Sequence, residues 1–144
     1  MTRAAVLALA LAACSPYLAA QSAAPPGRSA RLDEVLGSWS QVKSYRLELS
    51  RGVAIAIDCE RGGPCEHMRV ASDDPQIAEV RPASLDVLRP AGFDSRNEQT
   101  ASAFVVVGKA VGTTHLHVRV GKRSREVAVT VIAPPAAAVT QAAR

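Results

Sequence analysis

Apolar and polar residues alternate with a period of two along most of the chain between residues 45 and 132. Successive side chains of a β-strand point to opposite faces, so this period predicts strands with one buried and one exposed face. Clusters of Gly, Pro, Asn, Asp and Ser separate the alternating segments, as expected of turns. The predicted strands cover residues 45–49, 53–59, 65–71, 77–80, 84–88, 103–108, 113–120 and 125–132.

Short strands at regular spacing, each with one apolar face, must bury those faces against a second sheet. We therefore predict an all-β fold, a small antiparallel β-sandwich over residues 41–133. The apolar run Phe104–Val107 suggests a strand covered on both faces. The predicted core consists of Leu47, Leu49, Val53, Ile55, Ile57, Val70, Ile77, Val80, Val105, Val107, Leu116, Val118, Val127 and Val129.

The N-terminus has the pattern of an export signal over residues 1–13. Arg3 precedes a short apolar run, Ala4–Ala13, which is too short to span a bilayer as a helix. The run ends in Leu-Ala-Ala followed by Cys14, which resembles the lipobox of bacterial lipoproteins and predicts lipidation of Cys14. The alternative is an ordinary signal peptide cut near Ala20, in which Cys14 has no special role. Ser15 replaces the Asp that typically retains lipoproteins in the inner membrane, so the outer membrane is favoured.

Residues 14–40 are expected to form a tether and a short helix. Ala, Ser, Pro, Gly and Gln dominate residues 15–30, a composition typical of flexible linkers. Such a tether would have an r.m.s. reach of about 25–33 Å. Leu32, Val35 and Leu36 have helical spacing, and Gly37 would end the helix. The Ala-rich residues 134–144 are expected to be a disordered tail.

Cys59 and Cys65 remain as a pair if Cys14 carries a lipid, and in an oxidising compartment such a pair closes into a disulfide. The turn-forming residues between them agree with this pairing. A reduced metal-binding pair is the alternative. It is disfavoured because five residues separate the two cysteines and no second pair exists.

Composition limits the partners. The chain has a net charge of +4, and its Lys and Arg are scattered along the sequence without a basic stripe interleaved with aromatics, which argues against nucleic-acid binding. Aromatic residues make up 3% of the chain, so few side chains are available to stack on sugars. No small-molecule substrate or cofactor is indicated.

Residues 70–131 contain two motifs. An Asp-Pro turn precedes Ile-Ala-x-Val near residue 75, and a Gly-Lys-x-x-Gly-Thr-Thr-x-Leu-x-Val hairpin starts at residue 108. The motif residues are Asp74, Pro75, Ile77, Ala78, Val80, Gly108, Lys109, Gly112, Thr113, Thr114, Leu116 and Val118. These motifs resemble those of two related families, the bacterial immunoglobulin-like domains of group 2 and the N-terminal domain of pilus-formation secretins, and the Gly-Lys and Gly-Thr-Thr pairs favour the pilus family. The resemblance implies an immunoglobulin-like fold and a pilus or secretin context.

Candidate chemistry is sparse. His115 and His117 would share one face of a strand and could hold a metal if a third ligand approached, but an exposed outer face is the simpler interpretation. Asp73 or Asp74 is expected to hydrogen-bond its own backbone in the turn before Pro75, rather than the two acting as a carboxylate pair. The candidates for the third ligand of a metal held by His115 and His117 are Asp58, Glu66 and His67.

No nucleophile–base arrangement or phosphate loop is recognisable, so we do not expect an enzyme. The sequence predicts an exported, non-catalytic binding or assembly module, a lipoprotein facing the periplasm and accessory to a pilus, secretin or envelope complex. A surface- or carbohydrate-binding lipoprotein is the alternative. Contacts are expected from the polar loop 89–102 and an outer strand.

Overall fold

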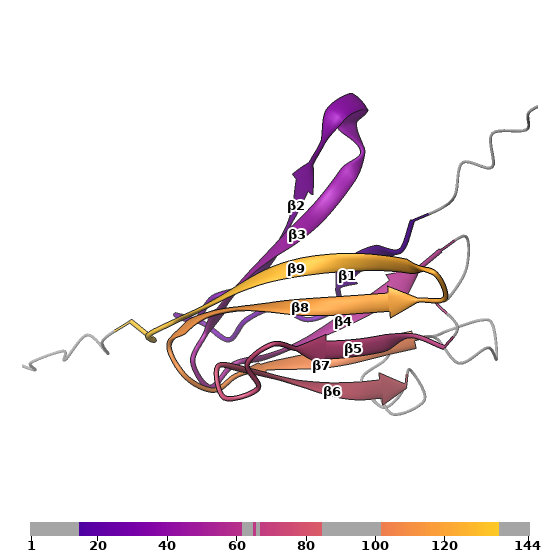
Figure 1. Ribbon diagram of the computed structural model, residues 1–144. Helices are drawn as coiled ribbons and strands as arrows, with labels where there is room; N and C mark the ends of the chain where they lie inside the picture. The colour runs from indigo at the N-terminus through magenta and orange to yellow at the C-terminus, as the bar shows by residue number, and fades with distance from the viewer. Residues whose placement is uncertain (1–14, 62–64, 66, 85–101, 136–144) are drawn as a thin grey trace, which may run out of the picture.

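The computed structural model describes residues 15–61, 65, 67–84 and 102–135, which form two packed sheets (Figure 1). One sheet has the strand order β1-β4-β7-β6 and the other β2-β3-β9-β8-β5. The strands are β1 (Tyr17–Ala20), β2 (Ala30–Leu36), β3 (Val42–Ser50), β4 (Ala54–Glu60), β5 (Arg69–Ser72), β6 (Ala78–Ser84), β7 (Ser102–Gly108), β8 (Gly112–Val120) and β9 (Arg123–Ile132). A single 3₁₀ turn, η1 (Ser38–Ser40), joins β2 to β3.

The predicted all-β, immunoglobulin-like sandwich is confirmed, because the alternating segments pair into two sheets whose apolar faces meet. Two details differ. The fold is not wholly antiparallel, since β3 runs parallel to β9. The strands expected at 77–80 and 84–88 are replaced by the continuous strand β6, and residues 85–88 lie outside the described residues.

The expected tether and helix before residue 41 are wrong. Tyr17–Ala20 forms β1, which pairs with β4, and the side chain of Leu18 is buried. Ala30–Leu36 is strand β2, paired with β3 so that Leu32 lies opposite Leu47. The segment forms a strand because pairing with β3 satisfies its backbone hydrogen bonds. In this strand Leu32, which suggested a helix, packs against the core.

The strand expected at 65–71 begins only at Arg69. Cys65 is bonded to Cys59, and His67 has a positive φ of 51°, which is incompatible with an extended strand.

Most of the predicted core is buried, but the face assignment of β7 is wrong. Phe104 and Val106 are fully buried, whereas Val105 and Val107 are only partly buried on the outer face. Gly108 lies on the same inner face of β7 as Phe104 and Val106, and its contact with the other sheet explains why this face is the buried one. A Cβ at Gly108 would lie 3.1 Å from the carbonyl oxygen of Ser50, so the two sheets approach closely at this point.

The core also contains residues that the alternation did not predict, and three predicted ones, Val70, Ile77 and Val80, lie at its margin. The additional buried residues are Leu18, Tyr45, Cys59, Cys65, Ala78, Ala103, Phe104, Val106, Val120 and Val131.

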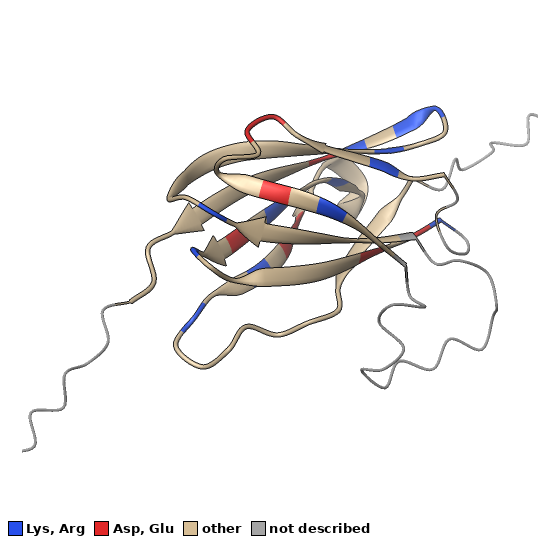
Figure 2. Ribbon diagram, turned by 90° about the horizontal axis from the view of Figure 1, so that it is seen from below, with Lys and Arg blue, Asp and Glu red and all other residues tan. Residues whose placement is uncertain are grey.

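Several predicted features lie outside the described residues: the signal segment 1–13, Cys14, Glu66, most of the loop 89–102, and residues 136–144 of the expected tail. Within the described part, no helix has the length and hydropathy needed to cross a membrane. Lys and Arg are spread over the ribbon and include the turn between β8 and β9 (Figure 2). The described chain starts and ends at opposite ends of the sandwich (Figure 1).

Candidate functional site

The residues that carry the family resemblance lie together at one end of the sandwich. Ala78 of β6 pairs with Gly108 of β7, and the N–H of Lys109 donates to the carbonyl of Ile77 (2.8 Å). The Lys109 ammonium lies 3.2 Å from a Glu79 carboxylate oxygen. A hydrogen bond from Arg81 lowers the pKa of Glu79, and a second, smaller contribution comes from the hydrogen bond of Lys109. The motif therefore joins β6 to the β7–β8 turn. This structural role explains why most of the motif residues are present.

Two hydrogen bonds to side chains stabilise the Asp-Pro turn of the motif, in addition to its backbone hydrogen bonds. The N–H of Gln76 donates to Asp74 Oδ1 (2.9 Å), as expected of an Asp in its own turn. The N–H of Asp74 donates to Oγ1 of the buried Thr114 (3.0 Å), which connects the turn to β8.

We expect Thr114→Val to lower the free energy of unfolding by about 1–3 kcal/mol, because the substitution keeps the shape but leaves the Asp74 N–H without its acceptor. Chemical denaturation measures the loss. Thr113→Val, on the exposed side of the same strand, is the control and should change stability by less than about 0.5 kcal/mol. Equal effects would mean that the turn does not depend on Thr114.

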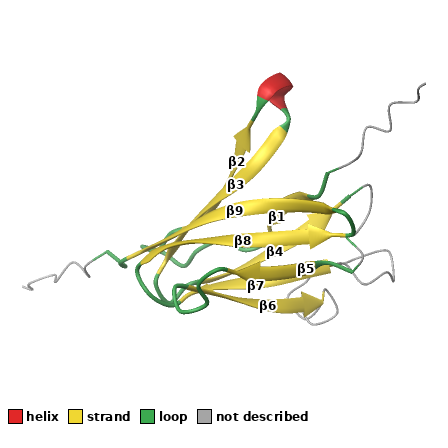
Figure 3. Cartoon of the chain, in the orientation of Figure 1, coloured by secondary structure: helices red, strands yellow, loops and turns green. Residues whose placement is uncertain are grey.

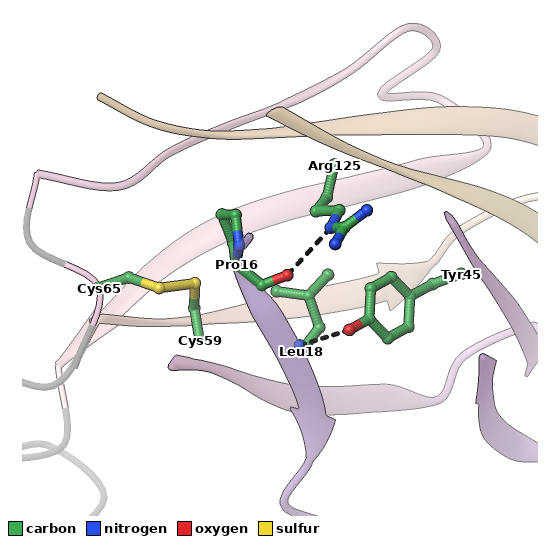
Figure 4. The surroundings of a disulfide bond; sticks show 6 residues. All are labelled: Pro16, Leu18, Tyr45, Cys59, Cys65 and Arg125. Carbon is green, nitrogen blue, oxygen red and sulfur yellow. Dashed lines mark hydrogen bonds between the residues drawn. A yellow bond between two sulfur atoms is a disulfide. The ribbon is translucent and has the colours of Figure 1, made fainter. Parts of the chain in front are cut away.

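The predicted disulfide between Cys59 and Cys65 is confirmed (Figure 4). The two Cα atoms are 5.4 Å apart, both side chains are buried, and the N–H of Cys65 donates to the carbonyl of Cys59 (3.0 Å). The bond lies where the chain leaves β4 of one sheet on its way to β5 of the other. It therefore fixes the start of the crossover between sheets.

Cys59→Ala/Cys65→Ala should lower the free energy of unfolding by about 2 kcal/mol, the value expected for a loop this short. Reductant should cause the same loss in the wild-type protein and no further loss in the double variant. Undiminished stability of the wild type in reductant would show that the bond contributes nothing.

A clamp around the N-terminal strand was missed by the sequence interpretation (Figure 4). The N–H of Leu18 donates to the hydroxyl of the buried Tyr45 (2.9 Å), and burial raises the pKa of Tyr45. Arg125 donates through Nε to the carbonyl of Pro16 and through a terminal nitrogen to that of Lys43, both at 3.1 Å. Strands β1, β3 and β9 are thus tied together at the start of the described chain.

His115 and His117 lie on the outer face of β8, each with half of its side chain exposed. His117 Nε2 is 3.0 Å from Asp73, and His115 Nε2 is 3.9 Å from Glu126, so the two rings face different carboxylates. Among the described residues, no three His, Cys, Asp or Glu side chains gather closely enough to hold a metal ion.

The hairpin of β2 and β3 projects from the sandwich as an arm with the η1 turn at its tip (Figures 1 and 3). Trp39 in this turn is 94% exposed, and Leu36 beside it is 56% exposed. Trp39 and Ser40 both have left-handed backbones, with φ of 62° and 56°. The tip therefore combines an unburied indole with a backbone that non-glycine residues rarely adopt.

A cavity of about 340 Å³ opens between β5 and β6, the edge strands of the two sheets. Its lining is mainly apolar, with Arg69 as the charged member. It has the chemistry to accept an apolar group but has no Trp or Tyr for stacking on a sugar. The apolar lining comes from Met68, Val70, Val80, Pro82, Ala83, Ala103 and Phe104.

The chain matches no protein-family model and no curated protein. Among solved structures it is similar to domains 4 and 5 of the S-layer protein SbsC, with 18% identity and a TM-score of 0.42, covering 83% of this chain and 54% of that one. A structure of domains 4–9 of the same protein gives 22% identity and a TM-score of 0.44, covering 70% and 15%. The chain thus spans about half or less of these structures.

Proposed function

We propose that this protein is an exported, non-catalytic binding module, held at the outer membrane by a lipid on Cys14, which docks onto a protein of an envelope assembly through the tip of its β2–β3 arm. The observation that carries the proposal is Trp39, which is 94% exposed on a left-handed backbone.

The backbone of the tip is unfavourable for the residues that occupy it. A left-handed conformation costs a non-glycine residue about 1–2 kcal/mol, and two such residues follow one another here. Glycine would remove this cost. The indole of Trp39 buries almost no surface within the described chain, so packing does not compensate for it. Strain that the fold does not need is a reason to assign the residue a role in binding.

The chemistry of the tip suits a protein partner. Trp is among the residues most enriched at the energetic centres of protein interfaces, where it fills a pocket on the partner. Leu36 adds apolar surface next to it. A projecting hairpin can also reach a partner without exposing the core of the sandwich.

Export is supported by the disulfide, because such bonds persist in oxidising compartments and are rare in the bacterial cytosol. The Leu-Ala-Ala-Cys14 segment supports the lipid. The resemblance of residues 70–131 to pilus-formation secretin domains supports a pilus or secretion component as the partner.

The test is Trp39→Gly in the cell that produces the protein, followed by chemical cross-linking, isolation of the module and identification of the attached proteins. We expect a pilus or secretion component on the wild type and a loss of at least 10-fold in the variant. Because glycine accepts the left-handed backbone, the variant should remain folded and unfold at the same or a higher temperature.

Val111→Ala is the matched control, since Val111 is also an exposed apolar residue but lies in the turn between β7 and β8. It should retain the partner. An unchanged cross-linking pattern in Trp39→Gly would exclude the arm as the contact. A polysaccharide that binds the wild type and is lost in Trp39→Gly would replace this proposal with the carbohydrate-binding alternative.

A further inference from the structure

Four basic side chains, scattered in the sequence, are gathered by the fold at one end of the sandwich, which we call the basic end. Arg69 of β5 lies directly opposite Arg119 of β8 in the strand register. Lys122 lies in the adjoining turn between β8 and β9, and Arg123 is the first residue of β9. The turn carries basic residues in Figure 2. All four residues are exposed.

The basic side chains of the basic end have no ion-pair partner in the part of the chain that the structure describes. Within the described ranges, none of the four side chains forms a hydrogen bond either. The described acidic residues at this end include Glu60, the last residue of β4, and Glu34, which hydrogen-bonds Tyr17 at the start of β1. Arg61 lies close to the same turn but already has an interaction of its own. Like charges directly opposite each other on neighbouring strands destabilise a sheet, so Arg69 and Arg119 together favour an anion outside the protein.

The chain enters the sandwich at this same end. Arg125, two residues after Arg123, donates a hydrogen bond to the carbonyl of Pro16, and β1 begins at the next residue. Only Ser15 and Pro16 therefore separate Cys14 from the first strand. Two residues span about 7 Å when extended, which is less than the Debye length at physiological salt.

We propose that the basic end is a membrane-facing surface that binds the anionic phosphate headgroups of the lipid layer in which the Cys14 lipid is inserted. The inference rests on the proposed lipid anchor for its choice of occupant. Each basic side chain near an anionic lipid surface strengthens binding by about a factor of five. Four such side chains would orient the anchored sandwich with the basic end on the membrane and the C-terminal end of β9 pointing away from it (Figure 1).

The test uses a shortened chain beginning at Ser15, exported behind an ordinary cleavable leader so that it carries no lipid but keeps every described strand. Its sedimentation with phosphatidylcholine vesicles is compared with sedimentation with vesicles containing about one third phosphatidylglycerol. We expect binding to the anionic vesicles alone, with a steep decrease as salt rises, because the attraction is screened. Absence of binding to anionic vesicles at low salt would overturn the proposal.

Arg69→Gln/Arg119→Gln should weaken binding to the anionic vesicles about 25-fold and should not lower the thermal midpoint, since a repulsive pair is removed. Arg28→Gln/Arg51→Gln removes the same charge from exposed positions at the opposite end and should weaken binding less than about twofold. Equal losses in the two double variants would mean that net charge, not the basic end, attracts the membrane.

Two further outcomes are decisive. Tighter binding to a single-stranded oligonucleotide than to anionic vesicles at equal phosphate concentration would overturn the lipid assignment in favour of a nucleic acid. The anchor itself is tested separately, by the mass of the Cys14 peptide in the wild-type protein. A protein that lacks the lipid but binds anionic vesicles through Arg69 and Arg119 would refute the lipid anchor and still support the basic end as a membrane-binding surface.

Discussion

Val106→Asp should abolish folding at physiological temperature. Val106 is completely buried in β7 between the two sheets, so the substitution places a carboxylate in an apolar environment with no described partner. An unpaired buried charge costs about 4 kcal/mol or more. This is comparable with the whole stability of a small domain, about 5–15 kcal/mol. Circular dichroism and the dispersion of amide NMR signals report the loss of fold.

Val105→Asp is the matched control, because it makes the same chemical change one residue earlier and on the opposite face. Val105 lies opposite Arg81 of β6 on the outer side of the sheet, where a carboxylate would gain a basic cross-strand neighbour. We expect a change of less than about 1 kcal/mol. A folded Val106→Asp together with an unfolded Val105→Asp would restore the original face assignment of β7.

The strength of the period-two pattern decided which strands were predictable. In β8 the exposed His115, His117 and Arg119 alternate with buried Leu116 and Val118, so the position of the strand and its faces followed from the sequence. In β7 four apolar residues follow one another, and either register fits such a run. The close approach of Gly108 to Ser50 decides between them, and no local pattern encodes that contact.

The N-terminal strands were not predictable for a related reason. β1 has four residues, of which only Leu18 is buried, and a strand this short shows no period. Its neighbours are Ala, Ser, Pro and Gln, a composition shared by linkers. The apolar residues of β2 fit a helix as well as a strand, and pairing with β3 over the arm settles the choice.

The candidate sites divide in the same way. Cysteine counting sufficed for the disulfide, because it depends on two residues six positions apart. The basic end could not be predicted, because Arg69 and Arg119 meet only through the pairing of β5 with β8. The sequence did not single out Trp39 either, since the role proposed for it depends on its exposure and on its left-handed backbone.

Leu18→Ala should lower the free energy of unfolding by about 2–5 kcal/mol, the range for truncating a buried leucine. Leu18 is 2% exposed and lies opposite Cys59 in the pairing of β1 with β4. Its N–H also holds the hydroxyl of Tyr45, so loosening β1 would leave that buried hydroxyl without a donor. Chemical denaturation of the shortened chain beginning at Ser15 measures the effect.

Leu36→Ala makes the same substitution at the tip of the arm, where the side chain is 56% exposed, and should change the free energy of unfolding by less than about 1 kcal/mol. A tether before residue 41 would instead make both substitutions equally harmless. The effect of Leu18→Ala relative to Leu36→Ala also indicates how far from the membrane a lipid-anchored domain can move. If Leu18 is part of the core, a lipid on Cys14 holds the sandwich within about 10 Å of the membrane instead of letting it search over about 25–33 Å. The partner of the β2–β3 arm must then itself lie close to that membrane.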